Sequence, residues 1–181
     1  MARIYTLANQ KGGVGKTTTT INLGASLASF GQRVLLVDLD PQANATSCLG
    51  VNRASLEKGT YNTLIGESTA LELILYNPRL KISLLPSSSA LIGAEIELVS
   101  ETGREHRLRD TLKPLSARYD YILVDCPPSL GLLTLNGLVA AQDGMIIPVQ
   151  CEYLSLEGIG QLSQTITRVR AAFFPALRIR E

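Results

Sequence analysis

The chain has 181 residues, of which 45% are apolar and 18% are charged, and its net charge is +1. This length can bury one sizeable core, and the composition is typical of a folded α/β protein and excludes a disordered chain. The balanced charge gives no bulk reason to expect nucleic-acid binding, so any DNA contact would need a local basic patch. We expect one domain over residues 1–181.

Apolar runs typical of strands covered on both faces alternate with segments long enough for helices. The runs lie at residues 4–8, 33–38, 80–86, 121–125 and 144–150, and residues 177–180 begin another. Helices are predicted at residues 16–30, 88–100, 104–118, 130–141 and 155–172. This alternation predicts a three-layer α/β fold with a doubly wound, mostly parallel sheet, whose ligands bind at the carboxyl ends of the strands.

Three of these helices carry further signals. Pro114 removes a backbone hydrogen bond, so a kink or break is predicted near Lys113. The helix at 16–30 is expected to face the sheet through its apolar residues Ile21, Leu23, Ala25, Leu27 and Ala28. The helix at 88–100 carries the apolar residues Leu91, Ala94, Ile96, Leu98 and Val99.

A glycine-rich segment between the first strand and the first helix predicts a phosphate-binding loop. Its residues are Lys11, Gly12, Gly13, Val14, Gly15, Lys16, Thr17 and Thr18. The glycines let successive backbone N–H groups point inward, and the helix behind them adds the positive end of its dipole. Lys16 would neutralise the β- and γ-phosphates, and Thr17 would offer its hydroxyl to Mg²⁺. The ordinary pattern has glycine where this chain has Gln10, so the match is to a variant with a second lysine, Lys11.

Acidic residues fall at the ends of two other strands. Asp125 ends the run 121–125, where P-loop enzymes place the acidic residue that holds Mg²⁺ through water. Asp38 and Asp40 alternate at another strand end, so they are predicted to point to opposite sides and to have different roles. One of them can face the phosphates and orient or deprotonate an attacking water.

The remaining reactive residues give weaker signals. Cys48, Cys126 and Cys151 lack the C-x-x-C spacing of a zinc site, and the last two are predicted to be buried because they follow apolar strands. His106 is predicted to be a solvated helix residue. No apolar stretch approaches the ~18 to 20 residues of a membrane span and no signal-peptide pattern is present, so we expect a cytoplasmic protein without a membrane partner.

Four segments together resemble the ParA/Soj family of chromosome or plasmid partition ATPases, deviant Walker-type P-loop proteins related to MinD. The segments are Lys11-Gly12-Gly13-Val14-Gly15-Lys16-Thr17-Thr18, Val37-Asp38-Leu39-Asp40-Pro41-Gln42-Ala43-Asn44, Asp125-Cys126-Pro127-Pro128-Ser129 and Pro148-Val149-Gln150-Cys151-Glu152. The resemblance covers the whole chain. It implies that the chain is the amino-terminal two-thirds of the family's domain, without the carboxyl-terminal part that supplies much of the adenine pocket.

The resemblance also implies site residues. ATP would be sandwiched between two subunits, with Lys11 reaching the partner's nucleotide and Gly12 lying where the two backbones approach. Asp40 would activate water, and with Lys11 and Lys16 it completes the expected catalytic set. Thr17 and Asp125 would serve Mg²⁺. The 125–128 loop resembles a switch that senses the γ-phosphate, and 150–152 matches a segment near the dimer interface.

The function implied is Mg²⁺-dependent ATP hydrolysis by a homodimer that cycles on the nucleoid with a ParB/Spo0J-like partner. Nonspecific DNA is an expected partner of full-length members. In this chain the basic ending, Arg168, Arg170, Arg178 and Arg180, is open to two interpretations, a solvated surface or a phosphate track. Two alternatives also remain open for the function: a nucleotide-binding module that does not hydrolyse ATP, and a MinD-like membrane-cycling ATPase.

Overall fold

A seven-stranded sheet forms the centre of the computed structural model, which describes residues 1–151 and 155–180. The strands follow the order β3-β4-β2-β5-β1-β6-β7, and every neighbouring pair is parallel except β3 with β4. Their bounds are β1 (Arg3–Leu7), β2 (Val34–Asp38), β3 (Leu75–Asn77), β4 (Ile82–Leu85), β5 (Tyr121–Asp125), β6 (Gly144–Ile146) and β7 (Ile179–Arg180). The predicted mostly parallel sheet is confirmed.

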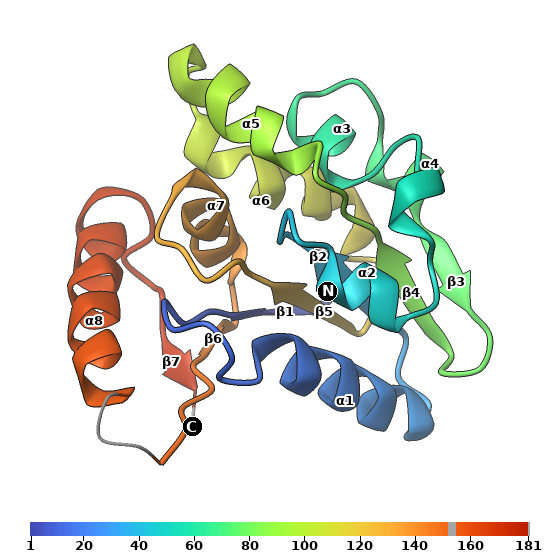
Figure 1. The fold of residues 1–181 in the computed structure, drawn as a ribbon, viewed down its shortest axis with the longest axis horizontal. Helices are drawn as coiled ribbons and strands as arrows, with labels where there is room; N and C mark the ends of the chain where they lie inside the picture. The colour runs from blue at the N-terminus through green and yellow to red at the C-terminus, as the bar shows by residue number, and fades with distance from the viewer. Residues whose placement is uncertain (152–154, 181) are drawn as a thin grey trace.

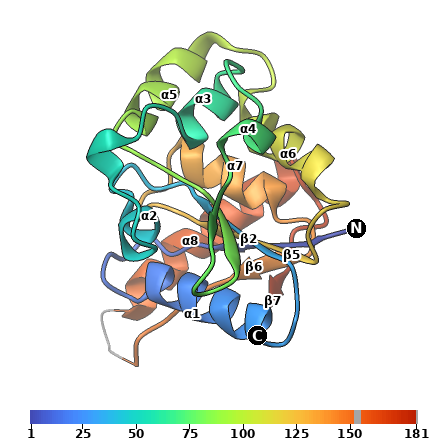
Figure 2. The same cartoon turned by 90° about the vertical axis from the view of Figure 1, so that its right-hand side faces the viewer.

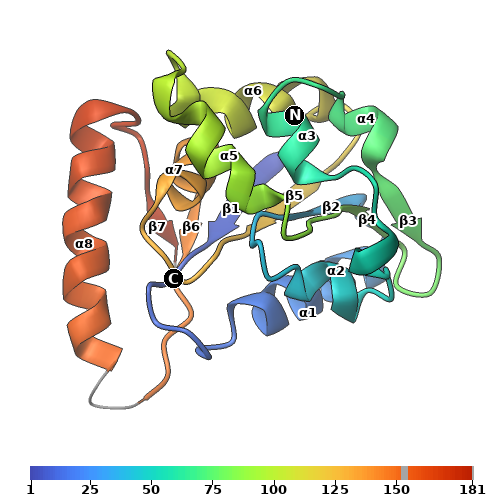
Figure 3. The same cartoon turned by 45° about the horizontal axis from the view of Figure 1, so that its top comes forward.

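Helices cover both faces of this sheet, as the three-layer prediction requires (Figure 1). One face carries α1 (Lys16–Ser29), and the other carries α6 (Arg107–Leu112) and α7 (Leu132–Ala140), with α8 (Ser155–Ala172) beside α7. α5 (Leu91–Glu97) lies on the outer side of α6 and α7 (Figure 3). The other helices are α2 (Asn44–Cys48), α3 (Thr60–Leu64), α4 (Ala70–Leu73) and short 3₁₀ turns at 53–55, 98–100, 104–106 and 113–115.

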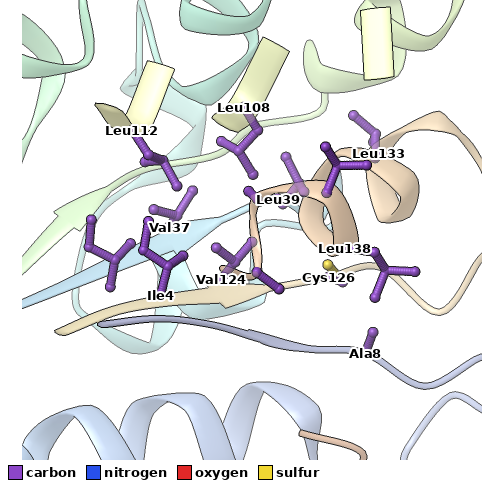
Figure 4. Close-up of a cluster of buried hydrophobic side chains, with 14 of the residues drawn as sticks. Ile4, Ala8, Val37, Leu39, Leu108, Leu112, Val124, Cys126, Leu133 and Leu138 are labelled. Atoms are coloured by element: carbon purple, nitrogen blue, oxygen red, sulfur yellow. The ribbon is translucent and has the colours of Figure 1, made fainter. Parts of the chain in front are cut away.

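Two apolar clusters fill the spaces between the layers. On the α1 side, the sheet side chains of β1, β2, β4 and β5 pack against the helix, and Gly24 brings the backbone so close that a Cβ there would lie 3.0 Å from Leu36 Cδ2. On the other side, Ile4, Val37 and Val124 of the sheet meet Leu108 of α6 and Leu138 of α7 (Figure 4). Burial of such side chains is the main favourable term in the stability of the fold.

Most element boundaries match the predictions to within three residues, and the larger differences have local causes. The strand at 144–150 ends at Ile146, because Pro148 cannot donate to a ladder. As predicted, the helix at 104–118 is broken near Lys113: α6 ends at Leu112 and Pro114 lies in a 3₁₀ turn. In α1 the buried stripe is Thr20, Gly24 and Ala28, while the predicted Ile21, Leu23, Ala25 and Leu27 flank it half-buried.

Two predictions about reactive residues were wrong. Cys151 is exposed, because its strand has already ended, whereas Cys126 is buried as expected. His106 is half-buried, not solvated, since its ring meets Phe173 edge-on at a centroid distance of 6.3 Å. Within the described residues, no helix is long and apolar enough to cross a bilayer.

Gly137 of α7 provides a test of how tightly the second layer is packed. A Cβ at Gly137 would lie 2.5 Å from Cys126 Sγ, whereas nothing lies within 4 Å of a Cβ at Gly160 of α8. Gly137→Ala should therefore lower the free energy of unfolding by about 1–3 kcal/mol through overpacking. Gly160→Ala, the matched control, should raise it by up to about 1 kcal/mol through helix propensity. Urea unfolding of both variants measures the difference. Equal stability of Gly137→Ala and wild type would show that the packing around Gly137 can accommodate a methyl group.

Candidate functional site

The loop between β1 and α1 has the backbone shape that the sequence predicts. Gly13 and Gly15 have φ values of +73° and +88°, in the left-handed region where glycine is favoured. Gly15 precedes α1 and no side chain caps that helix, so the first N–H groups of α1 face the cavity that the loop encloses. Figure 2 shows this loop and α2 at the same end of the sheet, opposite the amino terminus.

A cavity of about 360 Å³ lies in front of the loop and gathers predicted and unpredicted residues. The phosphate loop and the first turn of α1 form one wall. The segments that follow β2 and β5 form the opposite wall. The lining residues are Gly12, Gly13, Gly15, Lys16, Thr17, Thr18, Asp40, Asn44, Cys48 and Pro128. Val14 is buried beneath the loop, and Lys11 is half-buried at the start of the loop.

Lys16 is held by its own loop. Its Nζ donates to the backbone carbonyl of Lys11 at 3.1 Å, and the residue is only 7% exposed. Burial lowers the pKa of Lys16, while the nearby charges of Asp125 and Asp40 oppose that shift. The ammonium therefore lies in a partly desolvated site, where its attraction to an anion is stronger than in water.

Asp125 and Thr17, the predicted Mg²⁺ residues, are brought together. Thr17 Oγ1 donates to Asp125 Oδ2 at 2.6 Å, and Thr20 Oγ1 donates to Asp125 Oδ1 at 3.2 Å. Burial raises the pKa of Asp125 from 3.8 to about 7, against the two hydroxyl donors that lower it. A hydroxyl and a carboxylate are hard oxygen ligands of the kind Mg²⁺ takes alongside phosphate oxygens and water, so the pair fits this ion.

Asp38 and Asp40 have different surroundings, as the strand pattern predicts. The side chain of Asp38 is fully buried and accepts bonds from Thr46 N at 2.8 Å and Thr46 Oγ1 at 2.7 Å, which attach α2 to the end of β2. Asp40 lines the cavity, and its Oδ1 accepts from Gln42 N at 2.8 Å. Asp38 is thus engaged with the fold, whereas Asp40 faces the space beside Lys16.

The structure also adds residues that the motifs did not reveal. Asn9 donates to Pro148 O at 2.8 Å and accepts from Lys11 N at 3.1 Å, and Gln150 Nε2 donates to Gly13 O at 3.1 Å. The segment after β6 is therefore fastened to the phosphate loop. The only sequence signal for this role of Asn9 is its position next to the loop. The family segment that contains Gln150 did not assign that residue a chemical role. Glu152 of the same segment lies outside the described residues.

Comparisons with known proteins agree with this geometry. A family described as an AAA domain matches residues 2–179. The chromosome partitioning protein ParA of Myxococcus xanthus and the sporulation initiation inhibitor protein Soj of Bacillus subtilis are each 51% identical, over 99% and 94% of this chain. The chain spans 63% and 67% of their lengths.

A solved structure is also similar to this chain over almost its whole length. Cobyrinic acid a,c-diamide synthase of Mycobacterium smegmatis, with a bound ATP analogue and magnesium, is 42% identical with a TM-score of 0.95. The match covers 99% of this chain and 72% of that one. A nucleotide and magnesium are therefore accommodated on this fold in a similar protein.

The hydrogen bonds between Thr46 and Asp38 predict a pH-dependent stability. Burial raises the pKa of Asp38 from 3.8 to about 6, so the folded state binds more protons than the unfolded state between these values and loses stability as pH rises through them. Thr46→Val removes a donor to the ionised form and should steepen that loss. We expect a cost of about 1.5–3 kcal/mol at pH 8 and a smaller one at pH 5.

Thr46→Ser, which keeps the hydroxyl, is the control for this prediction. Thr46 Oγ1 also accepts from Ser87 N at 2.9 Å, but the loss of that bond does not depend on the ionisation of Asp38. Urea unfolding at both pH values separates the two contributions. A Thr46→Val cost that is the same at pH 5 and pH 8 would contradict the assignment to Asp38.

Proposed function

Because this chain belongs to the ParA/Soj family of P-loop ATPases, we propose that it binds ATP with Mg²⁺ and acts as an ATP-dependent dimerisation switch in chromosome or plasmid segregation. The observation that carries the proposal is the contact of Thr17 with Asp125 at 2.6 Å beside a loop whose amides face the same cavity. The partition proteins are also more similar in sequence, at 51% identity, than the diamide synthase at 42%.

The phosphate-binding role is divided among three kinds of group. Backbone N–H groups of residues 13–18 receive the phosphate oxygens, and Lys16 exchanges its bond to Lys11 O for the β- and γ-phosphates. Thr17 and Asp125 hold Mg²⁺, which when bound neutralises charge on the phosphates. Asn9 and Gln150 keep the loop in shape from the outside.

Hydrolysis and assembly are assigned to different residues. Asp40 lines the cavity beside the phosphate loop, where a carboxylate can orient or deprotonate water. Lys11 is assigned to the nucleotide of a second subunit, and Gly12, beside which a Cβ would meet nothing within 4 Å, to the surface where the subunits approach. A ParB/Spo0J-like protein accelerates the weak ATPase and resets the dimer on the nucleoid.

DNA binding is proposed for the full-length family and not assigned to a site in this chain. The basic residues near the end of the chain are partly engaged by the fold. Arg170 Nε donates to Leu177 O and Arg180 Nε donates to Asp143 O, each at 2.8 Å. These bonds favour a structural use of two of the four arginines.

Lys11→Ala tests the role in assembly. The variant should bind ATP, because Lys16 and the loop amides remain, but should stay monomeric with a nonhydrolysable ATP analogue. Sedimentation with the analogue measures the mass. Lys16→Ala should fail to bind ATP, and Lys113→Ala, which removes an exposed lysine, should behave as wild type. A stable Lys11→Ala dimer would remove the cross-subunit role.

Asp40→Ala tests the role in hydrolysis. It should bind ATP and dimerise, because the carboxylate is needed for water and not for the phosphates, while single-turnover phosphate release falls by about 10²- to 10⁴-fold. Asp110→Ala, which removes a carboxylate from the exposed side of α6, is the control. Phosphate release by Asp40→Ala at the wild-type rate would end the assignment. A wild-type chain that binds ATP without releasing phosphate would instead identify a non-hydrolysing module.

A further inference from the structure

Another cavity lies at the end of the sheet opposite the phosphate loop, and we call it the far cavity. Its volume is about 600 Å³, within the range of roughly 300–1,000 Å³ that is typical of small-molecule sites. It is bounded by residues 28 and 31–34 where α1 leads into β2, by residues 76, 81 and 83 of β3, β4 and their turn, and by residues 117–119 before β5. Figure 1 shows the carboxyl end of α1 beside the turn between β3 and β4. The far cavity shares no lining residue with the phosphate cavity, so the two are separate.

The far cavity is positively charged. Arg33, Lys81 and Arg118 line it, and within the described part of the chain no carboxylate does. Arg33 is engaged with the fold, because it pairs with Asp120 at 2.7 Å. Lys81 and Arg118 are exposed, and neither side chain has an ion-pair or hydrogen-bond partner among residues 1–151 and 155–180. Two unpaired cations on one cavity attract an anion, and the oxygens of a phosphate can accept hydrogen bonds from both.

Aromatic rings line the same cavity. Tyr76 of the edge strand β3 is 62% exposed, and Tyr119 is half-buried. The buried side chains of Ala28 and Val34 give the cavity an apolar base. Accessible rings beside cations favour a planar ligand, because an aromatic heterocycle can stack on them while its anionic group meets the charges. The volume exceeds that of inorganic phosphate, so the cavity has room for both parts of such a ligand.

The backbone at Lys81 supports a role for its side chain. Its φ is +56°, in the left-handed region that glycine and asparagine adopt more readily than lysine. Lys81 lies at the end of the turn between β3 and β4, where local structure alone favours glycine. The charge of Lys81 therefore explains its presence better than the turn does.

We propose that the far cavity binds an aromatic phosphate monoester of the size of a nucleoside monophosphate, with its phosphate between Lys81 and Arg118 and its ring against Tyr76. Nucleic acid suits the site less well, because a phosphate backbone needs cations spread along a surface, whereas these cations surround one cavity. The proposal does not depend on the function proposed above, since none of its residues belongs to the phosphate loop.

The test titrates the full chain with adenosine monophosphate, which lacks the β- and γ-phosphates assigned to the phosphate loop. Amide chemical shifts should move at Tyr76, Lys81 and Arg118 and stay unchanged at Gly13 and Thr17, and the affinity should fall as salt rises. Adenosine and inorganic phosphate should each bind about tenfold more weakly or worse, because each lacks one of the two contacts. Inorganic phosphate that binds as tightly as adenosine monophosphate would contradict the aromatic part of the proposal.

Variants test the two contacts separately. Lys81→Asn should weaken binding by about tenfold or more, because it removes a charge while asparagine tolerates the left-handed backbone. Tyr76→Ser should weaken binding by about tenfold, whereas Tyr76→Phe, which keeps the ring, should not. Lys113→Asn, which removes an exposed lysine outside the cavity, should bind as wild type does. Urea unfolding checks that each variant is folded, and a folded Lys81→Asn with wild-type affinity would overturn the site.

Further outcomes separate the far cavity from the phosphate loop and from nucleic acid. Lys16→Ala should bind adenosine monophosphate with wild-type affinity, whether or not the chain binds or hydrolyses ATP. Loss of binding in Lys16→Ala, or shifts confined to Gly13 and Thr17, would place the ligand at the phosphate loop and refute a second site. A single-stranded oligonucleotide without a terminal phosphate that binds more tightly through Lys81 and Tyr76 would identify nucleic acid as the occupant and overturn the proposal.

Discussion

The contact between Thr17 and the buried carboxylate of Asp125 is the constraint on which the site depends. It joins the first turn of α1 to the end of β5, and Thr20 adds a second bond one turn later. The loop between β1 and α1 is therefore fixed at both ends, because β1 and β5 are themselves neighbours in the sheet. A carboxylate placed this deeply is tolerated because hydroxyl donors satisfy its oxygens.

The charge balance of this region is consistent with the cation proposed to bind there. Burial raises the pKa of Asp125, the charges of Asp38 and Asp40 add to that rise, and the ammonium of Lys16 lies near Asp125 and Asp40. A polyphosphate would add further negative charge to a site that already disfavours ionisation of Asp125. A divalent cation held at Asp125 would reverse that balance, since a bound metal is the largest local charge in such a site.

Much of the architecture could be predicted because local sequence patterns indicate it: continuous apolar strands, the glycine loop, and Pro114 as a helix break. The segment between β2 and β4 could not, because its elements are too short to show a period and depend on particular side-chain and strand pairings. α2 is fixed by Thr46 binding to Asp38, and β3 forms only by pairing with β4. The bond from Gln150 to Gly13 spans 137 residues, and no local pattern encodes such a contact.

The packing of α7 connects the segment after β5, at the cavity end of the sheet, to α6. Gly137 lies against Cys126, and Thr134 Oγ1 donates to Ser129 O at 2.7 Å, so α7 follows the 125–129 segment. Asn136 accepts from Leu108 N at 3.0 Å and donates to Arg104 O at 2.9 Å, which ties α7 to α6. Because the same helix contacts both, the position of the 125–129 segment and the position of α6 constrain each other through α7.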